Sequence, residues 1–420
     1  MTYARTQGVL AGRLIGLMLV AGYVSACGGG TETCQASAAA PTVTVRDSAG
    51  VEVVTIEVAA DSLPEWELDS VVVTIPGTSR GAEPDLSLVL GALWLSDGRI
   101  VVPEHQSREL HLYDASGVYQ RSFGGAGDGP GEFRRMDAAT VGRGDTISVY
   151  DRADGAGGAV QLYHPEAGFV RSASLPPRGD DRPRREAWSW GPGTYLGLLE
   201  EPGTLTRVGH PTARLWPTSA ILELLGGRAD AARTISLPGS YSALDESGMD
   251  VRMFFSHQPV VLLGPDRLLY GSGERFELHE VDRSFVPRRI IRWPSVRTTL
   301  GAEEVDRVRA DWLAPRDRES QLVQQILEIL FAPELLPEDR PAIGRTFFDD
   351  EGRIWVGRFE TVGSGETLWY VLEPGGAPLA KLRIPREKRV LLSGVQGDLV
   401  LLAGRDALDV PLIEVVRLRK

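Results

Sequence analysis

The chain contains six histidines, the side chains best suited to bind a metal or to transfer protons near neutral pH. No two of them stand at the His-x-His or His-x-x-x-His spacing that places two ligands on one side of an element. His111 and His279 occupy matching positions in two copies of a repeated strand pattern, which favours a structural role. The sequence therefore predicts no metal site and no cofactor.

Carboxylates recur in turns between expected strands, at Asp97, Asp145, Asp266, Asp350 and Asp398. An Asp side chain in a turn hydrogen-bonds its own backbone, which is a sufficient structural reason for each of them. Residues 363–365 are expected to form a turn. Catalytic residues therefore stay unassigned.

The charge balance disfavours a nucleic-acid partner. The formal net charge is -12, from 45 basic and 57 acidic residues, with no long basic run. Binding a nucleic-acid backbone requires clustered Lys and Arg. Arg182, Arg184 and Arg185 form a small cluster that follows two aspartates. We expect a solvated loop there, with a phosphate site as the alternative.

The two cysteines, Cys27 and Cys34, both lie near the N terminus, so the body of the chain has no disulfide framework. Arg13 precedes an apolar run at residues 14–24 that is too short to cross a bilayer and fits a signal-peptide core. The segment Val24-Ser25-Ala26-Cys27 follows. It resembles the lipobox of bacterial lipoproteins, in which two small residues precede a cysteine whose sulfur receives diacylglycerol.

This resemblance implies that residues 1–26 are a lipoprotein signal peptide and that Cys27 is the lipid-attachment site. Residues 27–41 would then form the lipidated cysteine and a flexible linker, because their composition is rich in Gly, Ala, Ser and Thr. Several acyl chains anchor a protein stably to a membrane. By the same resemblance, Gly28 favours the outer membrane of a bacterial cell envelope. An ordinary secretory peptide cut near Ala26 is the alternative.

A strand pattern recurs along the rest of the chain. Each copy has a Gly- or Asp-containing turn, an aliphatic strand, a gap and further strands, in the period-two alternation of half-buried strands. The copies recur about every 45–50 residues where they are clean, a spacing typical of propeller blades. They lie at residues 95–123, 144–170, 190–199, 263–282, 348–372 and 395–416.

Six copies predict an all-β fold, a six-bladed β-propeller spanning residues 42–420. Two earlier strands, at 51–56 and 71–74, precede the copies, and one of them is expected to complete the last blade and close the ring. Two long gaps suggest insertions at about 205–255 and 295–342. The second has helical periodicity over about 302–332, and we expect its helices to cap one face, or alternatively to form a lid or a docking face.

A glycine-rich segment follows the first copy, and its residues Gly127, Gly129, Pro130, Gly131, Glu132 and Phe133 form an inter-blade motif with a structural role. The motif resembles the signature of NHL-type six-bladed propellers. Together with residues 44–53 it resembles a family of bacterial six-bladed β-propeller lipoproteins. That family has no common activity, so the resemblance implies a fold and not a function. A phosphate loop is disfavoured, because another strand follows and no Gly-Lys-Ser/Thr occurs.

The favoured function is a membrane-anchored binding scaffold for a protein, peptide or glycan, since no catalytic constellation is recognisable. The alternative is a lactonase-like hydrolase or lyase with its site in the central channel. Tryptophans at expected loops are candidates for a recognition surface or for the core, and the sequence leaves both open: Trp188, Trp190, Trp216, Trp293 and Trp312.

Overall fold

The computed structural model describes most of the chain after the predicted linker, namely residues 43–78, 83–152, 158–176, 184–202, 206–207, 213–226, 233–245, 250–314, 316–317, 319–359, 366–385 and 390–420. The predicted signal peptide, Cys27, Cys34 and the linker lie outside these residues. So do Arg182, His210 and the expected turn at 363–365.

The first two sheets each contain four consecutive antiparallel strands, paired in chain order. Tight turns with Gly or Asp join most of the strands, because such residues accept the backbone conformations that hairpins need. The first sheet comprises β4 (Leu93–Trp94), β5 (Ile100–Glu104), β6 (Glu109–Tyr113) and β7 (Tyr119–Gly124). The second comprises β8 (Met136–Val141), β9 (Ile147–Asp151), β10 (Ala159–His164) and β11 (Gly168–Ser174).

The third sheet has much longer strands than the first two. It comprises β12 (Glu186–Ser189), β13 (Thr194–Pro202), β15 (Ala213–Gly226), β16 (Arg233–Asp245) and β17 (Asp250–Arg252), with β14 (Thr206–Arg207) paired to β15. The expectation of a separate insertion at about 205–255 is therefore wrong. Strands β15 and β16 are the third and fourth strands of this sheet, and their register stays antiparallel along nearly their whole length.

The fourth sheet comprises β18 (Val260–Leu263), β19 (Arg267–Gly271), β20 (Glu277–Asp282) and β21 (Pro287–Arg292), extended by β2 (Val51–Ile56) and β1 (Val43–Ser48). The fifth has eight strands: β22 (Thr346–Phe348), β23 (Ile354–Gly357), β24 (Glu366–Leu372), β25 (Pro378–Pro385), β3 (Glu65–Pro76), β28 (Pro411–Arg419), β27 (Leu399–Arg405) and β26 (Val390–Gln396). Short 3-10 turns form at η1 (Ala60–Ser62), η2 (Arg143–Asp145) and η3 (Pro333–Leu335).

A strand from the start of the described chain pairs with the C-terminal strand, as the sequence predicts. Strand β3 pairs antiparallel with the C-terminal strand β28, over partners that run from Pro76 with Leu412 to Glu67 with Arg419. It also makes a short parallel contact with β25. Strand β2, the other early strand, instead runs parallel to β21 on the outside of the fourth sheet.

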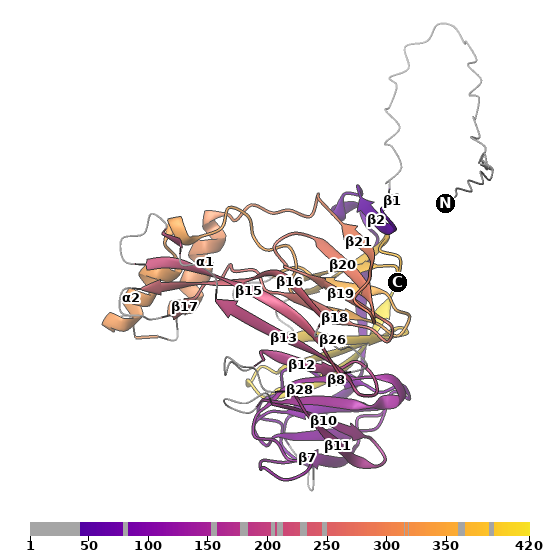
Figure 1. Ribbon diagram of the computed structural model, residues 1–420. Helices are drawn as coiled ribbons and strands as arrows, with labels where there is room; N and C mark the ends of the chain where they lie inside the picture. Colours follow the sequence, from indigo (N-terminus) through magenta and orange to yellow (C-terminus); the bar gives the residue numbers. More distant parts are fainter. Residues whose placement is uncertain are drawn as a thin grey trace, which may run out of the picture. The chain divides into compact units, whose positions relative to one another are not determined.

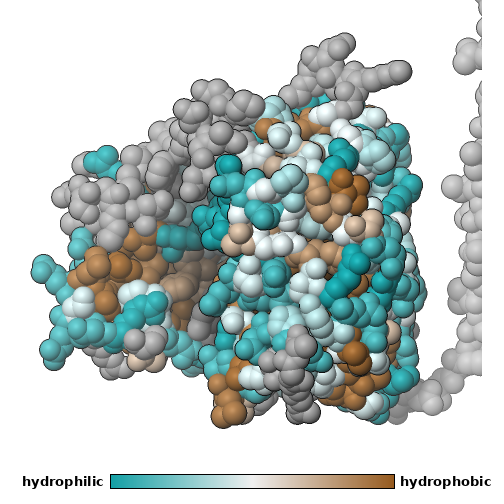
Figure 2. All heavy atoms as spheres, turned by 90° about the horizontal axis from the view of Figure 1, so that it is seen from below, coloured by the Kyte–Doolittle hydropathy of each residue, from teal (hydrophilic) through white to brown (hydrophobic). Residues whose placement is uncertain are grey.

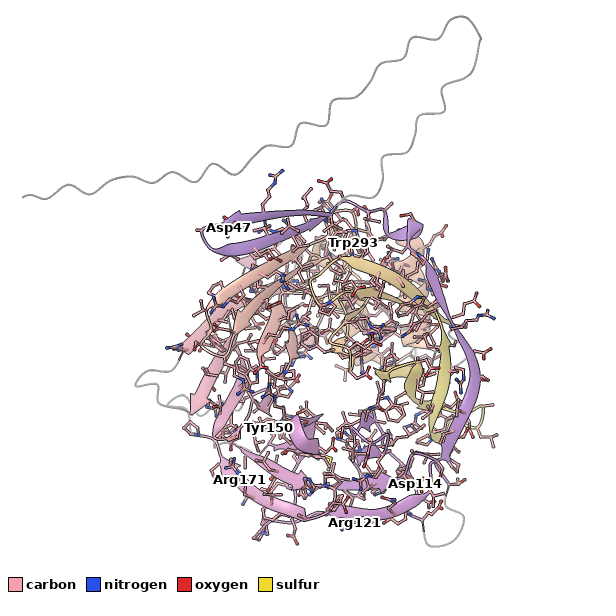
Figure 3. All side chains as sticks on the ribbon, turned by 90° about the vertical axis from the view of Figure 1, so that its right-hand side faces the viewer. Asp47, Asp114, Arg121, Tyr150, Arg171 and Trp293 are labelled. Carbon is pink, nitrogen blue, oxygen red and sulfur yellow. The ribbon has the colours of Figure 1, made fainter. Side chains whose placement is uncertain are left out.

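The described sheets follow one another around a central opening (Figure 3). The outer strands carry Arg121 (β7) and Arg171 (β11), whereas Tyr150 (β9) lies nearer the centre. Buried clusters fill the spaces between neighbouring sheets. One joins Val101 of β5 to Val149 of β9, and another returns from Ile413 of β28 to Ile100 of β5. Sheets that pack face to face in sequence order around a ring define a β-propeller topology.

Two helices lie between β21 and β22, within the segment for which helices were predicted: α1 (Ala302–Leu313) and α2 (Gln321–Leu330). They pack beside the far ends of β15, β16 and β17 (Figure 1). Val305 and Val308, one turn apart on α1, are buried against Val251 and Phe255. Neither helix has the length and apolar character of a bilayer-spanning helix, nor does any other helix among the described residues.

Part of the surface over the helical insertion is apolar. Figure 2 shows hydrophobic side chains gathered on the part of the molecule where α2 and β17 lie. Leu322 of α2 keeps 57% of its surface exposed. The helices therefore cover the long strands, with part of their own apolar stripe still open to solvent.

Candidate functional site

A pocket of about 540 Å3 lies where loops of the first and second sheets meet. It is lined by four arginines, one histidine, one aspartate and two apolar residues: Arg108, Arg134, Arg135, Arg152, His105, Asp137, Leu88 and Met136. Its residues come from the segment before β4, from the turn between β5 and β6, from the segment that enters β8, and from the end of β9. The pocket thus gathers four positive charges in a chain whose net charge is -12.

The buried carboxylate of Glu104, at the end of β5, holds one side of this pocket. Glu104 is 1% exposed. Its Oε1 accepts hydrogen bonds from the backbone N–H groups of Leu88 (2.6 Å) and Ser87 (3.3 Å), and its Oε2 accepts one from Ser107 N–H (2.5 Å). Burial acts to raise the pKa of Glu104, but these hydrogen bonds outweigh burial and lower that pKa. The ionised carboxylate therefore fixes two loops relative to each other.

Arg108 lies on the turn that Glu104 organises. Its backbone has a φ of 61°, a left-handed conformation that residues other than glycine adopt at a cost. Gly125 N–H donates to the Arg108 carbonyl at 2.8 Å, which stabilises this conformation. The Arg108 guanidinium donates to the Phe133 carbonyl at 3.3 Å. Its position is therefore set by contacts with the glycine-rich segment between β7 and β8.

A second buried carboxylate, Asp151 at the end of β9, holds the opposite side of the pocket. Asp151 accepts a hydrogen bond from Arg135 N–H at 2.8 Å, and Arg152 N–H donates to the Arg135 carbonyl at 3.0 Å. Burial raises the pKa of Asp151, although backbone hydrogen bonds and nearby arginines oppose the shift. Glu104 and Asp151 thus have the same role: each lies at the end of the second strand of its sheet and accepts hydrogen bonds from backbone N–H groups of a neighbouring loop.

Only part of the pocket's positive charge is neutralised by neighbouring carboxylates. Asp137 Oδ2 lies 2.9 Å from Arg152 Nε, and Asp137 Oδ1 lies 4.0 Å from Arg135 Nε. Arg134 forms an exposed ion pair with Asp128. Arg108 forms no ion pair among the described residues, although its charge acts on the Asp151 carboxyl. The lining itself therefore carries four guanidinium groups and one carboxylate, and Glu104, Asp151 and Asp128 lie close to it.

Two further carboxylates belong to strands of the third sheet, and one of them, Glu186, feels the charge of the pocket residue Asp137. Glu186 is on β12, the first strand of its sheet, and keeps 37% of its side-chain surface. Burial raises the pKa of Glu186; Arg185 opposes the shift, and the charges of Asp137 and Glu200 add to it. Glu200 itself lies 3.0 Å from Arg185 and 3.6 Å from Arg252.

The chemistry that this arrangement supports is anion binding. Guanidinium groups form strong, directional hydrogen bonds with carboxylate and phosphate oxygens. Within the described part of the chain, no group of three or more His, Cys, Asp or Glu side chains is placed to hold a metal ion.

The predicted inter-blade motif lies in the connection between β7 and β8 and borders the pocket. Gly129 N–H donates to the Glu132 carboxylate at 2.8 Å, and a Cβ on Gly127 would meet that carboxylate at 1.9 Å. Gly131 has a φ of 79°, and its carbonyl accepts a hydrogen bond from Tyr163 at 2.8 Å. Pro130 lies between Gly129 and Gly131, and Phe133 is fully buried against Tyr163.

The two matching histidines do not meet. His111 on β6 contacts Glu109 at 3.1 Å, and His279 on β20 contacts Glu277 at 2.8 Å, so each pairs with the glutamate two residues earlier in its own strand. Burial lowers the pKa of His111, against the opposing effect of Glu109. His105 is the histidine that lines the pocket, where its Nδ1 lies 3.2 Å from the Met136 carbonyl.

The interpretation of Arg184 and Arg185 as a solvated loop is wrong. Arg184 is buried, forms an ion pair with Glu223 and donates to the Pro176 carbonyl at 3.0 Å. Arg185 pairs with Glu200 and donates to Gln258 at 2.9 Å. Both side chains are held by acceptors from the third sheet and its connections.

The tryptophans belong mainly to the core. Trp188, Trp190 and Trp293 are buried. Trp190 Nε1 donates to the Gly264 carbonyl at 2.9 Å, and Trp293 Nε1 donates to the Val58 carbonyl at 2.8 Å. Trp312 of α1 is half-buried against the helical insertion, and the Trp216 side chain lies outside the described part. The core alternative holds for the three buried tryptophans.

The arginines of the pocket were not predicted, because they come from separate turns and no local motif joins them. A usable signal was present in the two strands that position them. Strands β5 and β9 are buried at every position and each ends on an acidic residue, Glu104 or Asp151. A buried strand that ends on a carboxylate requires donors for it, and loop N–H groups next to arginines supply them.

No family model matches this chain, and no curated protein matches it. Some solved structures resemble it weakly. A putative exported protein from Bacteroides fragilis is 12% identical, over 88% of this chain and 100% of that one, with a TM-score of 0.43. A member of the duf4221 family from Bacteroides vulgatus is 8% identical, over 84% and 98%, with a TM-score of 0.44. Regucalcin from Agrobacterium tumefaciens, a calcium-binding protein, is 14% identical, over 84% and 96%, with a TM-score of 0.32.

Proposed function

We propose that this protein is an exported, lipid-anchored six-bladed β-propeller that acts as a binding scaffold, and that its ligand carries an anionic group. The ligand is a protein, peptide or glycan with a carboxylate or phosphate, or a smaller anion of the same kind. The observation that carries the proposal is the pocket of four arginines, which buried carboxylates hold in place.

The strand pairing supports a count of six blades. The eight-stranded sheet consists of two sets of antiparallel strands, β22–β25 and β26–β28 with β3, joined only through a short parallel contact between β25 and β3. A separate buried cluster, which includes Trp355 and Val400, lies between these two sets. If each set is one blade, the described sheets give six blades, and β3 completes the last.

The anion site is tested by isothermal titration calorimetry with inorganic phosphate and sulfate. We expect both anions to bind, and Arg108→Gln and Arg135→Gln each to weaken binding by about tenfold or more, because each removes a charged hydrogen-bond donor. Arg171→Gln is the matched control, since Arg171 is exposed on the outer strand β11 (Figure 3). Equal binding by all variants would rule out the pocket as the site.

The lipid anchor is tested separately from the ligand. Cells that express the chain are labelled with radioactive palmitate, and we expect the label on the wild type and none on Cys27→Ala. An unlabelled wild type would exclude the anchor. If the label appears, fractionation of inner and outer membranes then tests the expected outer-membrane location.

A lactonase- or lyase-like activity is the second candidate, and Glu186 is the observation that favours it. A carboxyl with a raised pKa beside an arginine, here Arg185, can donate a proton to a leaving group. The test is a panel of lactones assayed with the wild type and Glu186→Gln. Turnover that the variant loses, while sulfate binding is kept, would support catalysis. Absence of turnover by the wild type would exclude this activity for those substrates.

A further inference from the structure

Two exposed leucines lie beside the arginine pocket. Leu88 lines the pocket and is 42% exposed, and Leu90 is 53% exposed. Val89, between them, forms a β-bridge with Glu104 and packs against a buried cluster. Because side chains alternate along an extended segment, Leu88 and Leu90 point to the side opposite Val89. An apolar strip therefore continues outward from the cationic space.

This apolar strip is fixed relative to the arginines. Glu104 accepts hydrogen bonds from Leu88 N–H on one loop and from Ser107 N–H, next to Arg108, on the other. His105 N–H also donates to the Leu88 carbonyl at 3.0 Å. Single exposed leucines are common on protein surfaces, whereas Leu88 is held at the pocket by the buried Glu104 carboxylate and Leu90 follows it two residues later on the same side.

We propose that the ligand of this pocket is an anion with an apolar arm: a phosphate or carboxylate group bound by Arg108 and its neighbouring arginines, joined to a hydrocarbon part that covers Leu88 and Leu90. This inference rests on the proposed anion-binding function and narrows its ligand class. The Arg108 guanidinium uses one donor on the Phe133 carbonyl, which leaves the others for the anion. Covering the leucines removes aliphatic surface from water, which favours binding.

A free amphiphilic anion and the headgroup region of an acidic lipid share this chemistry. Both place a charged group next to a hydrocarbon chain, so the pocket accepts the same contacts from either source. The two sources differ in whether the ligand is dispersed in water or presented at a membrane surface, and a separate arm of the experiment distinguishes them.

The experiment measures the binding of methyl, butyl and hexyl phosphate and of inorganic phosphate by calorimetry, with the full chain carrying Cys27→Ala so that no acyl chain is attached. We expect affinity to rise along the series, by about fourfold for each methylene group that is fully covered. Leu90→Ser, outside the pocket lining, is expected to reduce this rise and to bind inorganic phosphate as before. The double variant Leu88→Ser/Leu90→Ser is expected to lose the rise. Leu322→Ser, at an exposed leucine of α2, is the matched control and keeps the rise.

The outcomes separate this inference from the proposed function. Equal affinity for all four phosphates would overturn the apolar arm and leave anion binding intact. Absence of binding for all of them would overturn both. Thermal unfolding of each variant checks that the fold is retained. In the second arm, co-sedimentation with phosphatidylcholine vesicles that contain phosphatidylglycerol, lost in Arg108→Gln, would support a lipid source. Alkyl phosphate binding without co-sedimentation would support a free anion.

Discussion

Asp145 accepts two hydrogen bonds from Ser96 across the boundary between the first and second sheets, one from the backbone N–H and one from the hydroxyl, each 2.8 Å long. Both residues lie in turns that join the first two strands of their sheets. The Asp145 backbone has a φ of 54°, a left-handed conformation that residues other than glycine adopt at a cost. One turn residue therefore fastens two sheets together.

The Asp145–Ser96 contact predicts an energetic coupling between the two sheets. We expect Asp145→Ala and Ser96→Ala each to lower the free energy of unfolding by about 1 kcal/mol, and the double variant to cost about as much as one single variant, because both remove the same contact. Urea unfolding of the four proteins measures this cycle. Additive effects would show that the two residues act independently.

Asp398→Ala is the control for that cycle. Asp398 is also a turn aspartate, but its carboxylate pairs with Arg417 at 3.2 Å, where both side chains are more than half exposed. Exposed ion pairs contribute little, so we expect a loss of about 0.5 kcal/mol or less. A loss as large as that of Asp145→Ala would indicate that any turn aspartate contributes equally, whatever its partner.

The turn aspartates show which hydrogen bonds can be predicted from the sequence and which cannot. The prediction that they bond their own backbone holds for Asp97, which accepts a hydrogen bond from Arg99 N–H at 3.1 Å. It is wrong for Asp145 and also for Asp350, whose carboxylate accepts a hydrogen bond from Gly397 N–H in the next set of strands. The residue type predicts a turn, but the hydrogen-bond partner of the Asp side chain depends on which other turn lies next to it in the fold.

Some larger features of the fold were predictable from the sequence and others were not. Helices α1 and α2 were predictable because their apolar residues recur at helical spacing within one segment. The closing role of an early strand was predictable because a ring must pair its two ends. The parallel pairing of Val53 with Ile290 was not, because a contact between residues so far apart in the chain has no local signature. The arginine pocket was missed for the same reason.

The closing strand β3 is expected to control the stability of the whole ring. Ile75 is buried between the first sheet and the last, opposite Ile413 of β28. We expect Ile75→Ala to lower the free energy of unfolding by about 2–5 kcal/mol, because it leaves a cavity where the ends of the chain meet. Val72→Ala, on the exposed side of the same strand, should change it by about 0.5 kcal/mol or less. Equal effects in urea unfolding would contradict a closing role for the buried side.

The lowered pKa of Glu104 predicts that the stability of the fold depends on pH. Its pKa is lowered in the folded state, so the ionised carboxylate stabilises the fold above the ordinary value of 4.5, and this contribution is lost as the pH falls through the folded pKa. We expect Glu104→Gln to cost about 1–3 kcal/mol at pH 7, because the amide turns one acceptor into a donor that faces backbone N–H groups. The difference between the two proteins should shrink in acid.

Urea unfolding of both proteins across this pH range gives the measurement, and Glu166→Gln is the control. Glu166 is exposed and pairs with Arg99, so its replacement should cost about 0.5 kcal/mol or less at any pH. The Glu104 variant should also bind phosphate more weakly, because the loops that carry Leu88 and Arg108 lose their common support. Full phosphate affinity in a destabilised variant would separate the stability role of Glu104 from its role in the pocket.

Glu186 predicts a dependence of anion affinity on pH in the opposite direction. Burial raises its pKa, and wherever its carboxylate is ionised it repels an anion bound near Asp137. We expect Glu186→Gln to bind sulfate more tightly than the ionised wild type, by about two- to tenfold, as expected for one partly screened charge. As the pH falls and Glu186 takes up its proton, the sulfate affinity of the wild type should approach that of the variant.

Calorimetry with sulfate, whose charge is constant over this range, measures the effect, and Glu328→Gln on the exposed side of α2 is the control. A constant ratio between wild type and variant at all pH values would show that Glu186 does not sense the bound anion.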